Sequence, residues 1–393
     1  MRHSLGIKDT VKKNTMLIVL LATMVLFQVL ISSSGRGSLF APSNISNLIN
    51  QNSYVVILAS GMLLCILTGG NIDLSVGSVV ALVGALAGTL VVNLHWNIYL
   101  SILICLLTGL AIGAWQGFWI AYVRIPPFIT TLAGMLLWRG VALLILNGLT
   151  ISPFPAEYTK YFNSFLPNTG DPATVFSVTV IVSVIICLVY GFWALFDRYT
   201  KKKKGYATEP FVMTLSKVIL LSVVVLAVFT LLGKHKGVPV ILILLAIIVL
   251  GYSYYTSRTV PGRHLYAMGG NEKAAKLSGI DTNRVLFFVY TNMGFLSAVA
   301  ALVGVARFNS AAPTAGTNYE MDAIGSCFIG GASAYGGTGT IGGAIIGAIF
   351  MGVLNNGMSI LGIDANWQKA VKGIVVLAAV VFDVLSKKRV KSN

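Results

Sequence analysis

The chain has 393 residues, of which 56% are hydrophobic and only 10% are charged. A soluble domain of this length would carry about a quarter charged residues, so the composition excludes a water-soluble globular protein. The net charge of +16 comes from lysines and arginines in a few short clusters, a distribution that argues against a nucleic-acid surface. The apolar residues form runs of about 20, the length that crosses a bilayer core. The sequence therefore predicts an all-α, polytopic helical membrane protein.

The apolar runs predict about twelve membrane segments, some of them glycine-broken or re-entrant, in one transmembrane domain over residues 1–393. We place the segments at residues 16–32, 52–69, 73–94, 98–120, 128–147, 173–196, 211–232, 239–257, 285–307, 321–337, 340–361 and 368–385. The first is too long and uninterrupted for a cleaved signal, so we expect it to be retained.

The basic residues indicate how the chain is oriented. Eighteen of the 28 lysines and arginines lie in four stretches, with four in 2–13, five in 198–204, five in 258–284 and four in 387–391. Threading twelve segments with the N-terminus inside places all four stretches on the cytoplasmic side, together with the termini 1–15 and 386–393. The run Lys201–Lys204 then lies near anionic headgroups. Lys234 and Lys236 do not fit this orientation, because it places them in a short outer loop.

A polar stretch in the third basic region, residues 266–280, predicts a short helix on a loop between membrane segments. Asn271 is placed to cap its start, Glu272 lies in the first turn, and Gly279 is placed to end it. A soluble motor needs such a helix in order to push on a membrane subunit. The candidate coupling residues are Gly269, Gly270, Asn271, Glu272, Ala274, Ala275, Leu277, Ser278 and Gly279.

Two glycine-rich hairpins, at residues 68–78 and 329–340, are each followed by a helix of small residues. They predict two pseudo-repeated halves whose broken helices meet near a translocation path, with two simple helical hairpins as the alternative. Small residues also recur at four-residue spacing, which favours close helix packing within the chain or across a dimer. These are Gly84 with Gly88, Gly109 with Gly113 and Gly117, and Gly343 with Gly347.

Asp73 needs an explanation, because a carboxylate near a membrane segment is costly and usually has a partner or a function. It can cap a helix that begins at Leu74, contact a passing polar solute, or hold a proton or cation. Glu320 and Asp322 are predicted to cap the helix that they begin.

Further polar residues could line a solute path. The candidate pathway residues are Asn71, Asp73, Ser75, Ser78, Gln116, Asn309, Ser333, Asn355 and Asn356. The amides of Gln116, Asn355 and Asn356 can equally bond between helices. Asn309, with Ser310 and Thr314, lies at the outer mouth, where it can touch a delivering protein or remain solvated.

Enzyme chemistry is not expected from this chain. The sequence contains no GxxxxGK[ST] phosphate loop, so we expect no ATP hydrolysis by this chain itself. All four cysteines lie within apolar segments, where they are expected to pack, and the four histidines lack the spacing of metal ligands. No cofactor or metal is expected here.

Four motifs in order carry a family resemblance: residues 70–78, 263–280, 313–324 and 352–357. Over about 44–383 the chain resembles the monosaccharide-importer permeases of ABC transporters, of the ribose, galactose and xylose type. That family often has Gly-Gly-Thr-Ser where this chain has Gly330-Gly331-Ala332-Ser333. The two extra segments in 171–236 resemble the longer xylose and multiple-monosaccharide branch.

The resemblance implies a transport subunit of a bacterial cytoplasmic membrane. Two copies would form the pathway, a sugar-type ATPase subunit would bind ATP and Mg, and an extracytoplasmic sugar-binding protein would deliver xylose, arabinose or galactose. The alternatives are an ABC importer of another small solute, such as a nucleoside, a branched-chain amino acid or a furanosyl signal, and a stand-alone secondary transporter that uses Asp73.

Overall fold

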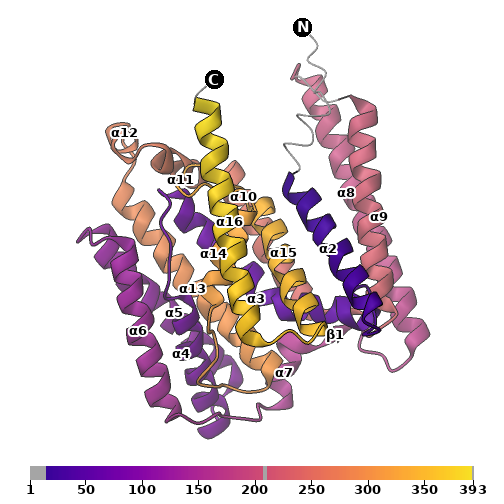
Figure 1. Cartoon of the computed structure of the whole chain (residues 1–393), viewed down its shortest axis with the longest axis horizontal. Coiled ribbons are helices and arrows are strands. Elements are labelled where there is room, and N and C mark those ends of the chain that lie inside the picture. Colours follow the sequence, from indigo (N-terminus) through magenta and orange to yellow (C-terminus); the bar gives the residue numbers. More distant parts are fainter. Residues whose placement is uncertain (1–14, 207–209, 392–393) are drawn as a thin grey trace.

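The computed structural model describes residues 15–206 and 210–391, and most of them are helical (Figure 1). The helices are α2 (Thr15–Ser33), α3 (Pro42–Leu67), α4 (Val76–Gly88) continued by the π-helical turn η1 (Thr89–Asn93), α5 (Ile98–Ala121), α6 (Pro127–Leu146), α7 (Ala156–Asn163), α8 (Pro172–Lys203), α9 (Phe211–Gly233), α10 (Val240–Arg258), α11 (Val260–Gly270), α12 (Glu272–Leu277), α13 (Thr282–Phe308), α14 (Tyr319–Ile329), α15 (Ile341–Ile360) and α16 (Ala365–Lys391). The two strands are β1 (Phe165–Leu166) and β2 (Val238–Pro239).

Ten of the described helices are long and apolar enough to cross a membrane, which confirms a polytopic helical membrane protein. They are α2, α3, α4 with η1, α5, α6, α8, α9, α10, α13 and α15. In hydrocarbon, only helices and closed barrels satisfy all their backbone hydrogen bonds internally.

The predicted span at 321–337 is wrong as a full span, because α14 has only 11 residues and the chain then turns through Gly331, whose φ is +86°. The predicted segment 368–385 lies within the 27-residue helix α16.

The core forms around α13, which packs against α3, α4 and α5. Glycines make the contact with α5 close: a Cβ atom on Gly294 would lie 2.2 Å from the carbonyl oxygen of Gly109. A Cβ atom on Gly113 would lie 2.5 Å from the carbonyl oxygen of Tyr290. The four-residue spacing in α5 thus serves packing within the chain.

Helices α8 and α9 form a hairpin at the side of the molecule (Figure 1). Only 17% of the α8 span and 6% of the α9 span are buried in the chain. Asp171 caps α8 by accepting hydrogen bonds from the backbone of Ala173 and Thr174. The Thr174 hydroxyl, which also donates to it, holds the pKa of Asp171 below its usual range. The antiparallel pair β1–β2 joins this region to α10.

The start of α2, the turn between α8 and α9, α12 and the C-terminal end of α16 all lie at one end of the molecule (Figure 1). Three of the four basic stretches used to orient the chain therefore lie together. The fourth, 2–13, lies outside the described residues. Lys234 and Lys236 follow α9 at the opposite end.

Candidate functional site

A buried polar cluster lies where α3 ends and α4 begins. The backbone N–H and hydroxyl of Ser75 donate to Asp73 Oδ1 over 2.8 and 2.6 Å. Gln116 on α5 donates from Nε2 to Ser75 Oγ over 2.7 Å. All three residues are at most 2% exposed. The amide of Gln116 thus bonds between α5 and the first hairpin.

The predicted helix start at Leu74 is wrong. Helix α4 begins at Val76, with Ser75 in the N-cap position and without a side-chain cap. Asp73 instead closes a local turn two residues before the helix, because a short carboxylate reaches the backbone N–H two residues on. Ser78 is buried in the first turn of α4. Asn71 donates to Thr68 Oγ1 over 3.2 Å.

The two glycine hairpins pack directly against each other, as two meeting broken segments should. A Cβ atom on Gly70 would lie 2.0 Å from the carbonyl oxygen of Ala334, and one on Gly336 would lie 2.6 Å from Gly69. The backbone N–H of Gly337 donates to the carbonyl of Leu67 over 3.1 Å. Ser333 is buried within the second hairpin, where its N–H donates to the carbonyl oxygen of Thr338 over 2.9 Å.

The start of α4 also meets the turn before α14. A Cβ atom on Gly77 would lie 2.1 Å from the carbonyl oxygen of Gly316 and 2.6 Å from Glu320 Oε2. Arg139 on α6 holds the same turn, since its Nη1 donates to the carbonyl oxygen of Ala315 over 2.6 Å. We did not single out Arg139 from the sequence, although a charged residue within a membrane segment was the available signal.

Glu320 and Asp322 lie in the first turn of α14, as predicted. The N-cap residue is Asn318, which has a left-handed backbone and makes no side-chain cap, and Asp322 does not cap the helix. Asp322 instead accepts from the Tyr54 hydroxyl over 2.6 Å and pairs with Lys372 Nζ at 2.9 Å. Its side chain is 2% exposed, so this is a buried ion pair that joins α14 to α3 and α16.

The remaining pathway candidates lie elsewhere. Asn356 exchanges two hydrogen bonds with Asn44, of 2.9 and 3.0 Å, and so joins α15 to α3. Asn355 is half-buried, and its carbonyl oxygen has no hydrogen-bond partner among the described residues. Asn309, at the far end of α13, accepts from the backbone N–H of Phe154 over 2.9 Å. The structure thus groups the candidates from the two hairpins and separates Asn309, Asn355 and Asn356 from them.

The polar segment after Gly270 is helical, as predicted. Asn271 caps α12 by accepting from the backbone N–H of Ala274 over 3.0 Å, and Gly279 follows the helix with φ +86°. Glu272 pairs with Arg124, which follows α5, at 2.6 Å. The sequence did not reveal that the preceding residues form a second helix, α11, whose start is capped by Thr259.

Helix α11 lies directly on the C-terminal end of α3, just before the first glycine hairpin, and on the second hairpin. A Cβ atom on Gly269 would lie 1.8 Å from the carbonyl oxygen of Leu67 and 2.3 Å from the backbone nitrogen of Gly337. The Tyr266 hydroxyl donates to the carbonyl oxygen of Gly339 over 3.0 Å. At the far end of α12, Leu277 is 90% exposed. The segment therefore touches the end of α3 and the second hairpin on one side and presents an apolar side chain outward on the other.

Gly269→Val is expected to destabilise the protein severely, because backbone atoms cannot retreat as a flexible side chain can. Overpacking typically lowers the free energy of unfolding by about 1–3 kcal/mol. Because the new side chain would meet two backbone segments, we expect a loss at the upper end of that range. Thermal unfolding in detergent measures the effect. Gly270→Val is the matched control, since a Cβ atom there would meet nothing within 4 Å. Equal melting temperatures for the two variants would contradict this packing.

A bundle of apolar helices in which two broken segments meet beneath a polar helical loop is the architecture of a membrane transport permease. The chain belongs to the family described as branched-chain amino acid transport system / permease component, which it matches over residues 44–380.

Several relatives match the chain over nearly its whole length. It is 36% identical to the xylose transport system permease protein XylH of Escherichia coli K12, with 96% of this chain and 93% of the relative covered. The XylH protein of Haemophilus influenzae is 34% identical, with 96% and 98% covered. The ribose import permease protein RbsC of Bacillus subtilis is 36% identical, with 90% and 89% covered. No solved structure matches the chain.

Proposed function

We propose that this chain is the membrane-spanning subunit of an ATP-driven importer for a monosaccharide of the xylose, arabinose or galactose type. The names of the relatives support the solute, since they are permeases for xylose and ribose. The observation that carries the mechanism is the contact of α11, through Gly269, with the end of α3 at Leu67 and with the second glycine hairpin at Gly337. Through that contact, a displacement of α12 can be transmitted to the buried polar cluster of Asp73, Ser75 and Gln116.

In this mechanism α12 is the coupling helix. A separate sugar-type ATPase subunit binds ATP and Mg, closes, and displaces α12, which the Arg124–Glu272 ion pair joins to the end of α5. Helix α11 then shifts the hairpins at 68–78 and 329–340, and the pathway alternates between outward-facing and inward-facing. A sugar is neutral and rich in hydroxyls, so transient hydrogen bonds with polar side chains suit a path that must release its cargo.

Three partners complete the proposed importer. A second copy of the chain forms the pathway with the first, the ATPase lies beneath α12, and an extracytoplasmic sugar-binding protein docks at the opposite end, where Asn309 lies. The clustering of basic residues at the α12 end supports a cytoplasmic location for that end and for both termini. The membrane is the bacterial cytoplasmic membrane.

Purification of the tagged chain in mild detergent from its native cell tests the proposal. We expect a stoichiometric ATPase with phosphate-loop motifs to accompany it, and liposomes containing both proteins and the binding protein to accumulate labelled xylose only with ATP. Competition by unlabelled ribose, a nucleoside and leucine reports the solute class. A chain that purifies alone and accumulates solute under an ion gradient would instead be a secondary transporter, with Asp73 as its candidate ion site.

A further inference from the structure

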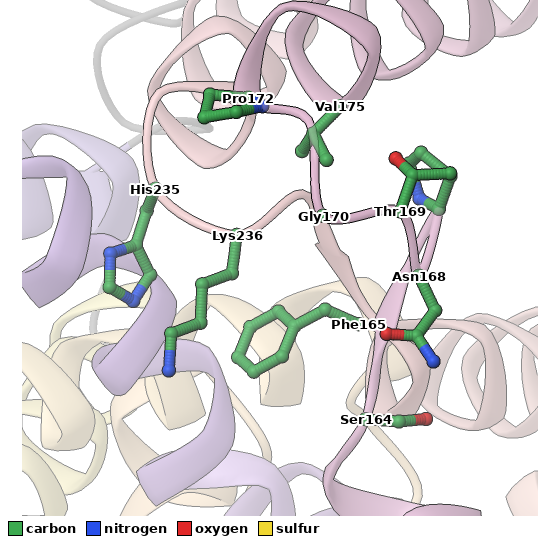
Figure 2. A pocket seen from close by; sticks show the side chains of 10 residues that line it. Ser164, Phe165, Asn168, Thr169, Gly170, Pro172, Val175, His235 and Lys236 are labelled. Atoms are coloured by element: carbon green, nitrogen blue, oxygen red, sulfur yellow. The ribbon is translucent and has the colours of Figure 1, made fainter.

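A polar cavity lies at the base of the α8–α9 hairpin, at the end of the molecule opposite α12. It has a volume of about 320 Å³ and lies between the segment 164–175 and the turn that holds His235 and Lys236 (Figure 2). The Phe165 ring stands between the two walls, with the Lys236 ammonium 5.8 Å from its centroid. The transport mechanism uses none of these residues.

A larger apolar crevice adjoins this cavity between α8, α9 and α10. Its volume is about 670 Å³. Its lining residues share an aliphatic or aromatic character, apart from Thr179, whose hydroxyl donates to the carbonyl of Val175 in its own helix. They include Leu166, Val182, Ile186, Phe229, Leu242 and Ile243.

The cavity and the crevice are neighbours on the two faces of β1. Pro167 lines both. Side chains alternate along β1, so Phe165 lines the polar cavity and Leu166 lines the apolar crevice. Along α8 the lining runs from Val175 to Ile186, which is about 16 Å at 1.5 Å per residue. One leaflet occupies about half of a hydrocarbon core of about 30 Å, so the site spans the depth of one leaflet.

The mouth of the site is positively charged. Lys234 and Lys236 are exposed there, although short loops on that side of a membrane protein are usually poor in lysine. Burial, with the neighbouring Lys236, lowers the pKa of His235, so the lysines supply the charge at neutral pH. The nearby carboxylate of Asp171, which caps α8, is ionised and offsets part of this positive charge.

We propose that an anionic phospholipid occupies this site, with its phosphate beside Lys236 and Lys234 and an acyl chain in the crevice between α8, α9 and α10. A polar, cationic mouth above an apolar groove of one-leaflet depth matches that molecule in charge, polarity and length. The lipid fills the space between the peripheral hairpin and α10, where the chain supplies few contacts of its own.

Native mass spectrometry of the full chain tests the proposal after reconstitution in vesicles of equal phosphatidylglycerol and phosphatidylcholine and mild re-extraction. We expect retained phosphatidylglycerol, enriched over phosphatidylcholine. Lys234→Ala with Lys236→Ala should lower its occupied fraction by about fivefold per lysine. Lys160→Ala is the matched control, as an exposed lysine at the same end that lines neither cavity.

A second variant tests the acyl-chain site. Ile243→Trp fills the crevice and should lower retention of phosphatidylglycerol to a similar extent, whereas Leu250→Trp, two turns along the same face of α10, should not. Val182→Trp on α8 repeats the test from the opposite wall. Retention that is unchanged in all these variants would overturn the proposal. So would displacement of the bound species by millimolar inorganic phosphate with no effect of Ile243→Trp, which would show a phosphate site alone.

Discussion

Replacing Glu272–Leu277 with glycine and serine is expected to reduce uptake of labelled sugar to background while the chain remains folded in the membrane. The replacement removes the side chains that favour the helix α12 and the Glu272 partner of Arg124, so ATPase movement no longer reaches α11. The measurement is uptake in cells that express equal amounts of the two proteins, with protein quantity checked in isolated membranes. Normal uptake by this variant would contradict the assignment of α12 as the coupling helix.

A point variant sharpens this prediction. Leu277 is 90% exposed, so Leu277→Asp should leave the melting temperature unchanged. If the leucine is buried against the ATPase, its loss removes about 2 kcal/mol of binding, and copurification of the ATPase should fall by tenfold or more. Lys276→Ala and a Gly/Ser replacement of Lys201–Lys204, a polar stretch at the same end, are the controls and should retain uptake.

Asp322→Ala is expected to lower the free energy of unfolding by about 3–5 kcal/mol, because it leaves the charge of Lys372 without its buried partner. The same change removes the acceptor of the Tyr54 hydroxyl. Thermal unfolding in detergent measures the loss. The double variant Asp322→Ala with Lys372→Met should recover much of it, since no unpaired charge then remains.

An exposed ion pair provides the control for this prediction. Lys201 and Asp197 approach within 2.6 Å, but their side chains are 47% and 37% exposed. Lys201→Ala should therefore cost at most about 1 kcal/mol. If Asp322→Ala is no more destabilising than Lys201→Ala, burial does not govern the strength of the Asp322–Lys372 pair.

Local features of the structure could be predicted from the sequence. Runs of apolar residues predicted all ten of the long membrane helices, since crossing hydrocarbon depends mainly on length and composition. The cap at Asn271 and the end near Gly279 were predicted because both depend on neighbours within a few residues. The hairpins at 68–78 and 329–340 were predicted to meet from their glycines alone.

The candidate site was predicted less completely, because its contacts join distant parts of the chain. Tyr54 lies 268 positions from Asp322, and Lys372 lies 50 positions away. A carboxylate in the first turn of a helix favours capping when only its neighbours are known. Arg124 and Arg139 were missed for the same reason, since their partners lie far along the chain, on α12 and in the turn before α14.

The sequence by itself therefore determined the class of protein, the membrane segments and the capped helix α12, because hydrophobic length, charge distribution and capping act over short distances. Only the tertiary structure decided that α14 is short, that α4 begins after a turn closed by Asp73, and that Gly269 rests on the end of α3 and on the second hairpin. These features depend on how closely the backbones of different helices approach and on which charges become buried between them. Packing among helices that are far apart in the chain decides both.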